Sequence, residues 1–344
     1  MGLSLIIKES PYILHEGRLG DYSMHMKMEA SRTVAREGSN KRKSYFRKMG
    51  RQYQLILLSI PFVLILILFN YVPLWGWIMA FQNYSPAKGI TGSSFVGLEN
   101  FTMLFEDDQF FRVLRNTLVM SILSLVTGFV CAIVLALLLN EVRASFFKRT
   151  IQTLTYIPHF VSMVVIANIV LTFLSPDGGF INTLLMNMGF IKEPIYFMGK
   201  GEWFWVIHTL VGLWKEIGWS TIIYLAVIAG LNQEVYEAAD VDGANRFNKI
   251  WHITIPGIMP TAMILLILSV GSIINAGYES QFLLSNPLVI DYSEVLDLYA
   301  LNLSFGSQQY SAGVALSIFK SIVSVILVVM VNYAARRTGK SGVF

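Results

Sequence analysis

The chain has 344 residues, of which 54% are hydrophobic and only 14% are charged. A soluble domain carries about 25% charged residues, so this composition excludes an ordinary soluble globular protein. The mean hydropathy is +0.57, and long apolar windows recur along the chain, which indicates an integral membrane protein. The single cysteine, Cys131, lies inside an apolar run, so no disulfide framework is expected.

Six apolar windows are long enough to cross a membrane. In chain order they cover residues 55–80, 116–139, 151–174, 203–230, 259–283 and 312–335. Prolines inside these windows, such as Pro158, are tolerable in membrane helices, where neighbouring groups satisfy the freed carbonyls. The sequence therefore predicts an all-α membrane protein with six transmembrane helices.

The lysines and arginines predict how these helices are oriented. Nineteen of the 26 lie in the segments on one side of the windows, eleven of them up to Arg51, and five lie in the segments on the other side. The positive-inside rule then places both termini in the cytoplasm. We expect a basic cytoplasmic tail over 1–50, a first transmembrane helix with an extracellular loop over 51–111, and a second basic tail over 336–344.

Residues 231–258 form a polar, acidic segment between two apolar windows on the predicted cytoplasmic side. Gly243 suits the left-handed position that ends a short helix, and a second short helix is expected to stop at Pro256. Ala238 and Ala239 give the first helix a small face that fits a groove on another protein. An ordinary connector is the alternative. The acidic rim of this face comprises Glu237, Asp240 and Asp242.

The spacing in this loop resembles the EAA motif of permease subunits in ABC importers. The resemblance extends over about 112–335, which looks like a type I permease core preceded by one extra helix. Shorter stretches at 98–101, 115–117 and 156–158 look like sugar permeases, above all the LplB-like branch for oligosaccharide and polysaccharide-fragment uptake. The residues that match the motif are Glu237, Ala238, Ala239, Gly243, Ile253 and Pro256, and Asp240 beside them is a further candidate for coupling to the ATPase.

The resemblance implies a permease that works by alternating access in the cytoplasmic membrane of a bacterium. Its implied partners are a second homologous permease, two cytoplasmic ATP-binding subunits docked on the coupling loop 231–258, an extracellular lipid-anchored solute-binding protein, the sugar and membrane lipid. The sequence has no G-x-x-x-x-G-K-[ST] motif, so ATP and Mg²⁺ are expected only in the partner subunits. We expect this chain to be no enzyme, with no catalytic residue, metal, cofactor or nucleic acid of its own.

Polar and aromatic residues in and near the windows are the candidates for the substrate path. Ionisable groups inside a membrane are costly and therefore point to function. Sugar sites combine aromatic faces with planar hydrogen-bonding groups. The candidates are Trp214, Lys215, Glu216, Trp219, Asn275, Tyr278, Glu279, Gln281 and Lys320.

Plainer roles for these candidates stay open at this stage. Lys215 or Lys320 could pair with Glu216 or Glu279 as a structural contact between helices. An ion-coupled secondary transporter is the rival function, although it would be expected to show inverted repeats, and none is evident in the six windows. A permease for a solute other than a sugar is a further alternative.

Overall fold

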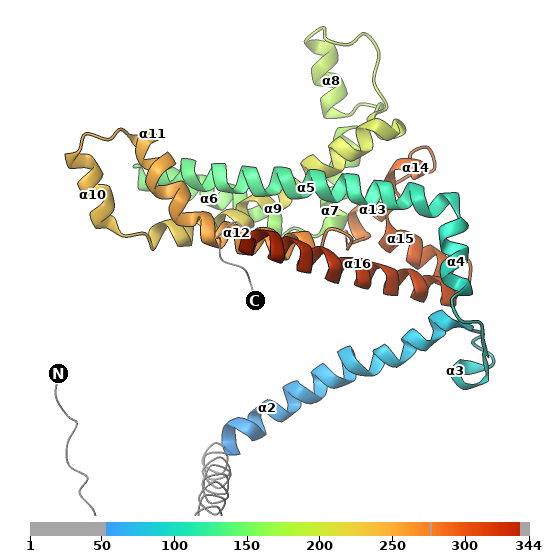
Figure 1. Cartoon of the computed structure of the whole chain (residues 1–344). Coiled ribbons are helices and arrows are strands. Elements are labelled where there is room, and N and C mark those ends of the chain that lie inside the picture. Colours follow the sequence, from blue (N-terminus) through green and yellow to red (C-terminus); the bar gives the residue numbers. More distant parts are fainter. Residues whose placement is uncertain (1–52, 276, 338–344) are drawn as a thin grey trace, which may run out of the picture. The chain divides into compact units, whose positions relative to one another are not determined.

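The computed structural model describes residues 53–275 and 277–337, and nearly all of its regular elements are helices (Figure 1). The chain divides into two compact units, residues 1–75 and 76–344, which are described separately. The basic tail predicted over 1–50 lies outside the described residues. Residues 338–344 of the second predicted tail also lie outside them.

The first unit contains one apolar helical run. It comprises α2 (Tyr53–Leu66), the π-helical η1 (Ile67–Tyr71) and the beginning of the 3₁₀-helical η2 (Val72–Phe81). The run from Tyr53 to Phe81 is long and apolar enough to cross a membrane. Pro61 lies inside α2 without ending it, as is common in membrane helices.

The second unit begins within η2, which is followed by a small hairpin. Strand β1 (Gln82–Asn83) pairs antiparallel with β2 (Ser94–Phe95), and α3 (Gly89–Gly92) lies between them. Helix α4 (Glu99–Glu106) then leads into α5 (Asp108–Glu141). The side chain of Asp107 accepts a hydrogen bond from the backbone N–H of Gln109, which caps the N-terminus of α5.

Six further helices and α5 build the body of this unit (Figure 1). Helix α9 lies against both α5 and α6, and α12 lies against α16. At Gly218 the α6 and α9 backbones meet, because a Cβ there would fall on the carbonyl of Thr155. The further helices are α6 (Ser145–Phe160), α7 (Met163–Phe173), α9 (Gly201–Ala229), α12 (Ile255–Gly271), α13 (Glu279–Leu284) and α16 (Tyr310–Arg337).

Short elements cover the two ends of the helices. At the end where α9 finishes lie α10 (Gln233–Val241), α11 (Arg246–Lys249) and the π-helical η4 (Ile250–Thr254). The other short elements are α8 (Phe180–Asn187), η3 (Phe197–Gly199), α14 (Ile290–Ser293), α15 (Leu296–Leu301) and the π-helical η5 (Asn302–Gly306). In Figure 1, α8 projects from the body and α10 lies at the far end from α4 and α15.

The third predicted window, 151–174, is not one straight helix. Helices α6 and α7 meet at an angle of 103°. Pro158 has no N–H to donate within α6, and Val161 and Ser162 adopt extended backbone after the helix ends. The Ser162 side chain then caps α7. In the described part of the chain, five helices are long and apolar enough to cross a membrane, or six if this bent pair counts as one span.

The fifth predicted window, 259–283, is displaced along the chain. The helix runs continuously from Arg246 to Gly271, so the expectation that a short helix stops at Pro256 was wrong. Pro256 lies in the first turn of α12 and is preceded by the wider π turn of η4. The proline lacks an N–H and crowds the preceding turn, and the wider turn carries the helix past it.

Candidate functional site

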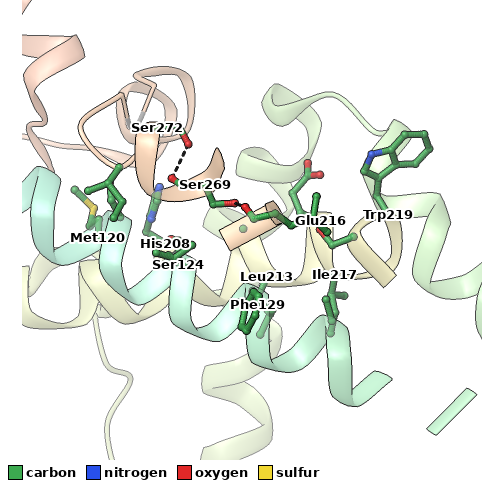
Figure 2. A pocket seen from close by; sticks show the side chains of 18 of the residues that line it. Met120, Ser124, Phe129, His208, Leu213, Glu216, Ile217, Trp219, Ser269 and Ser272 are labelled. Carbon is green, nitrogen blue, oxygen red and sulfur yellow. Dashed lines mark hydrogen bonds between the residues drawn. The ribbon is translucent and has the colours of Figure 1, made fainter. Parts of the chain in front are cut away.

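A cavity of about 440 Å³ lies between α5, α9 and α12, with the beginning of α13 at its edge (Figure 2). Its aromatic wall residues are Phe129, Trp219 and Tyr224. Its polar groups include Ser124, His208, Glu216, Ser269, Ser272 and Gln281. Such a mixture of aromatic faces and a few polar groups is typical of a small-ligand site.

Glu216 and Trp219 place a carboxylate and an indole ring at one end of this cavity, and His208 lies toward the other end (Figure 2). The Glu216 Oε2 lies 2.8 Å from the Nδ1 of His159, which comes from α6. The His159 ring stacks on Trp219, with centroids 4.5 Å apart and an angle of 5° between the planes. The carboxylate and the indole are therefore held in fixed orientations by one histidine.

Lys215 does not line the cavity, and its side chain contacts the break between α6 and α7. Its ammonium donates to the carbonyls of His159 at 2.8 Å and Val161 at 2.9 Å. The last carbonyls of a helix have no donors within the helix, and a cation there also complements the helix dipole. The Glu216 Oε1 is 3.9 Å away, so that contact is the weaker one. Lys215 thus caps the end of α6.

Lys320 is buried in α16 and forms an ion pair with Asp297. Asp297 also accepts a hydrogen bond from the backbone N–H of Gly277 at 3.0 Å. Lys320 does not line the cavity. The structural contact considered from the sequence is therefore made with Asp297 rather than with Glu216 or Glu279.

Of the four candidates expected at the end of the fifth span, the structure brings only Gln281 into the cavity. The displaced helix ends at Gly271, so Asn275 and Tyr278 lie in the connection that follows it, and Glu279 begins α13. Trp214 is half exposed and lies outside the lining. The structure thus groups Glu216, Trp219 and Gln281 and leaves the other candidates outside.

Two buried polar atoms beside the cavity lack hydrogen-bond partners among the described residues. They are Nε2 of Gln281 and Nδ1 of His208. Ser280 Oγ connects the same two side chains, lying 3.0 Å from His208 Nε2 and 2.9 Å from Gln281 Oε1. Buried polar groups are nearly always paired, so these two atoms are suited to a polar ligand or water.

His208 and His159 were not among the sequence candidates. His208, Gly212 and Glu216 follow at intervals of four residues in α9, so they share one helix face. That spacing in the sequence could have indicated His208. No sequence pattern indicated His159, because its contact with Glu216 depends on how α6 packs against α9. No group of three or more metal-binding side chains gathers within residues 53–275 and 277–337.

The second candidate region, the coupling loop, is a well-capped pair of short helices. The Asn232 side chain accepts from the N–H of Glu234 at 2.9 Å and begins α10. Gly243 has a φ of 76°, the left-handed conformation expected after a helix. Lys249 and Asp240 form an ion pair at 2.7 Å that ties α11 to α10.

The loop residues that match the motif divide into exposed and inner positions. Glu237, Ala238, Asp240 and Gly243 are exposed on α10 and its end, and Ala239 is partly buried. Tyr236 and Thr254 join the two arms of the loop through their hydroxyls at 2.8 Å. The further members Ile253 and Pro256 lie in η4 and at the beginning of α12, on the inner arm.

Comparison with known proteins gives a consistent result. Residues 124–340 match the family described as the inner membrane component of binding-protein-dependent transport systems. The polygalacturonan/rhamnogalacturonan transport system permease protein YteP of Bacillus subtilis is 42% identical over 304 residues, covering 88% of this chain and 94% of the relative. Protein LplB of Bacillus subtilis is 41% identical over 301 residues, with the same 88% and 94% coverage.

Solved structures resemble the chain over most of its length. One is a bacterial ABC transporter involved in the import of the acidic polysaccharide alginate, with a TM-score of 0.78, 36% identity, and coverage of 85% of this chain and 98% of that one. Another is a bacterial alginate ABC transporter in complex with a periplasmic protein bound to an alginate pentasaccharide. It has a TM-score of 0.79, 36% identity, and coverage of 86% and 99%.

Proposed function

The chain belongs to the family of inner membrane components of binding-protein-dependent transport systems, and we propose that it carries oligosaccharides or polysaccharide fragments through the cavity between α5, α9 and α12. It is a permease subunit of an ABC importer of the bacterial inner membrane, of the sugar-transporting kind. It is not itself an enzyme, since the ATPase of such importers resides in partner subunits. Membership of this family sets aside the ion-coupled secondary transporter.

The observation that carries the substrate path is the composition of the cavity. Trp219 offers an aromatic face held by His159, and Glu216 offers a hydrogen-bond acceptor beside it. Nε2 of Gln281 and Nδ1 of His208 have no hydrogen-bond partner among the described residues and can form hydrogen bonds with polar groups of a ligand. Hydroxyl-rich sugars match this combination of a stacking face and separate polar groups. Lys215 is assigned to the α6 end and not to the sugar.

The partners of this chain follow from the same proposal. The exposed α10 with Glu237, Ala238 and Gly243 is the part that docks into a cytoplasmic ATP-binding subunit, and ATP with Mg²⁺ binds there rather than here. A second, homologous permease completes the pathway. A lipid-anchored binding protein delivers the sugar, and the pentasaccharide-bound periplasmic protein in the similar alginate transporter supports this arrangement.

Replacing Gly243 by valine tests the coupling role. A Cβ at Gly243 would meet nothing within 4 Å, so the change acts on the backbone conformation alone. A β-branched residue is strained at a φ of 76°, at a cost of about 1–3 kcal/mol. We expect Gly243→Val to lower ATP-driven uptake of labelled galactotetraose by at least about tenfold in proteoliposomes that contain the whole complex.

Gly243→Asn is the matched control, because asparagine tolerates the left-handed region, and it should retain uptake within about twofold. Recovery of the ATP-binding subunit with each variant shows whether docking is lost as well. Full uptake by Gly243→Val would remove the coupling role. Uptake of labelled peptides in place of sugars by the unaltered complex would overturn the substrate class.

A further inference from the structure

A second and larger cavity, of about 710 Å³, lies at the end of the second unit opposite the coupling loop. It is enclosed by the end of β1, α4, α15, η5 and the first turn of α16. Its lining includes three tyrosines, Tyr84, Tyr299 and Tyr310. Three carboxylates line it as well, those of Glu99, Asp107 and Glu294, whereas the described residues that line it include no lysine or arginine. We call this space the outer cavity.

The floor of the outer cavity is held in place because two of its three carboxylates, Asp107 and Glu294, already accept hydrogen bonds. Glu294 accepts hydrogen bonds from Gln109 Nε2 at 2.8 Å and from Asn302 Nδ2 at 2.9 Å. Asp107 accepts from the hydroxyl of Tyr299 at 2.5 Å. Burial, and then the neighbouring Asp107, raise the pKa of Tyr299, so its phenol stays a donor at physiological pH. These side chains hold the shape of the cavity.

The rim, in contrast, presents unused hydrogen-bonding groups. The side chains of Asn83, Gln308 and Gln309 are exposed and make no hydrogen bond to the described residues. Gln308 has a φ of 57°, and within the described part of the chain it is the one residue other than glycine with a positive φ. This conformation costs about 1 kcal/mol or more, and such strained residues concentrate at functional sites.

The strained loop is fixed by its neighbours rather than free to relax. The N–H of Gln309 donates to the carbonyl of Leu303 at 2.8 Å, and the N–H of Ser307 donates to that of Asn302 at 2.9 Å. Next to it, Tyr310 meets Tyr84 edge to face, with centroids 6.0 Å apart and planes at 86°. The rim therefore joins a fixed aromatic ring to amides that point into solvent.

We propose that the outer cavity binds an uncharged sugar unit of the substrate before it enters the membrane. A tyrosine ring and free amides suit a hydroxyl-rich ring. The carboxylates repel an acidic sugar, because no lysine or arginine among the described lining residues offsets their charge. This site rests on the proposed sugar transport, but it is separate from the cavity between α5, α9 and α12.

Equilibrium binding of galactotetraose to the full chain in lipid nanodiscs tests this site, with tetragalacturonate as the acidic counterpart. We expect Tyr310→Ala and Gln309→Ala each to weaken galactotetraose binding by at least about fivefold. Tyr310→Phe keeps the ring and should stay within about twofold. Gln233→Ala removes a matched exposed amide in α10, at the opposite end of the second unit, and should leave galactotetraose binding unchanged.

The same titration on Glu216→Gln separates this site from the one in the membrane. Unchanged galactotetraose binding in that variant supports the outer cavity. Absence of binding by the unaltered chain would overturn the outer site, as would equal binding of tetragalacturonate. So would binding that Glu216→Gln abolishes while Tyr310→Ala and Gln309→Ala leave it intact, and in that case sugar uptake through the membrane cavity would still stand.

Discussion

Lys215 shows how hydrogen bonds stabilise a charged side chain within an apolar helix. An ionised lysine in an apolar helix is costly unless its ammonium finds oxygen partners. Here the partners are the carbonyls of His159 and Val161, which the end of α6 leaves without donors. The lysine ammonium therefore gains acceptors, and the carbonyls at the end of α6 gain a donor. Its neighbour Glu216 is left to face the cavity and His159.

Replacing Lys215 by methionine should destabilise the chain by about 1–3 kcal/mol, because two partly buried carbonyls lose their donor. The unfolding free energy of the full chain, measured by SDS titration in detergent micelles, checks this value. Trp214→Phe is the control, since Trp214 is half exposed and lies outside the cavity lining. An unfolding free energy for Lys215→Met equal to that of the unaltered chain would contradict the capping role.

At the scale of elements, glycines and prolines decide how the helices meet. Pro158 ends α6 soon after it, whereas Pro256 is absorbed by the π turn of η4 and the helix continues. Both prolines were visible in the sequence, but their outcomes depend on which groups lie nearby. Gly218 permits the direct contact between the backbones of α6 and α9 that brings His159 to Glu216.

Gly218→Ala should force α6 and α9 apart and cost about 1–3 kcal/mol, because a methyl group would fall on the Thr155 carbonyl. Gly212→Ala in the same helix is the matched control, since a Cβ there meets nothing within 4 Å. Alanine favours a helix by about 1 kcal/mol over glycine, so Gly212→Ala should be neutral or stabilising. Thermal unfolding of both variants decides the matter, and equal losses would rule out the backbone contact as the cause.

At the scale of the whole molecule, the two ends of the second unit differ in chemistry. Helix α9 has 29 residues, so the segment before it and α10 after it lie about 40 Å apart along the helix axis. The end with α10 carries the exposed motif and Arg246, which lies 4.0 Å from Glu141 of α5. The other end carries the outer cavity with its carboxylates. This polarity suits a protein that receives its substrate at one end and its energy at the other.

Cysteine labelling tests the predicted orientation of these ends. In a chain with Cys131→Ala, Phe190→Cys should react with a membrane-impermeant maleimide in intact cells. Phe146→Cys, at the beginning of α6, should react only after the membrane is opened. Both positions are well exposed, at 74% and 86%, and neither lies in α10, so access depends on the side of the membrane. The reverse pattern would invert the topology predicted from the lysines and arginines.

The sequence by itself determined the class of the protein, the approximate helices and the coupling loop. These features are local: apolar windows, charge counts and the spacing from Glu237 to Pro256 lie in continuous stretches. Window boundaries were less secure, because a proline's effect depends on its surroundings, as Pro158 and Pro256 show. The left-handed conformation of Gly243 was predictable because it ends the short helix that directly precedes it in the sequence.

Only the tertiary structure decided which polar residues share a site. Lys215 and Glu216 are neighbours in sequence, yet one caps a helix and the other lines a cavity, because α6 crosses α9 at that point. The outer cavity joins residues more than 200 positions apart, and the hydrogen bond from Tyr84 to Ser311 spans 227. Contacts of this kind depend on how the helices pack and on which backbone carbonyls of other helices lie nearby. The spacing of residues within one stretch of sequence does not predict either of these.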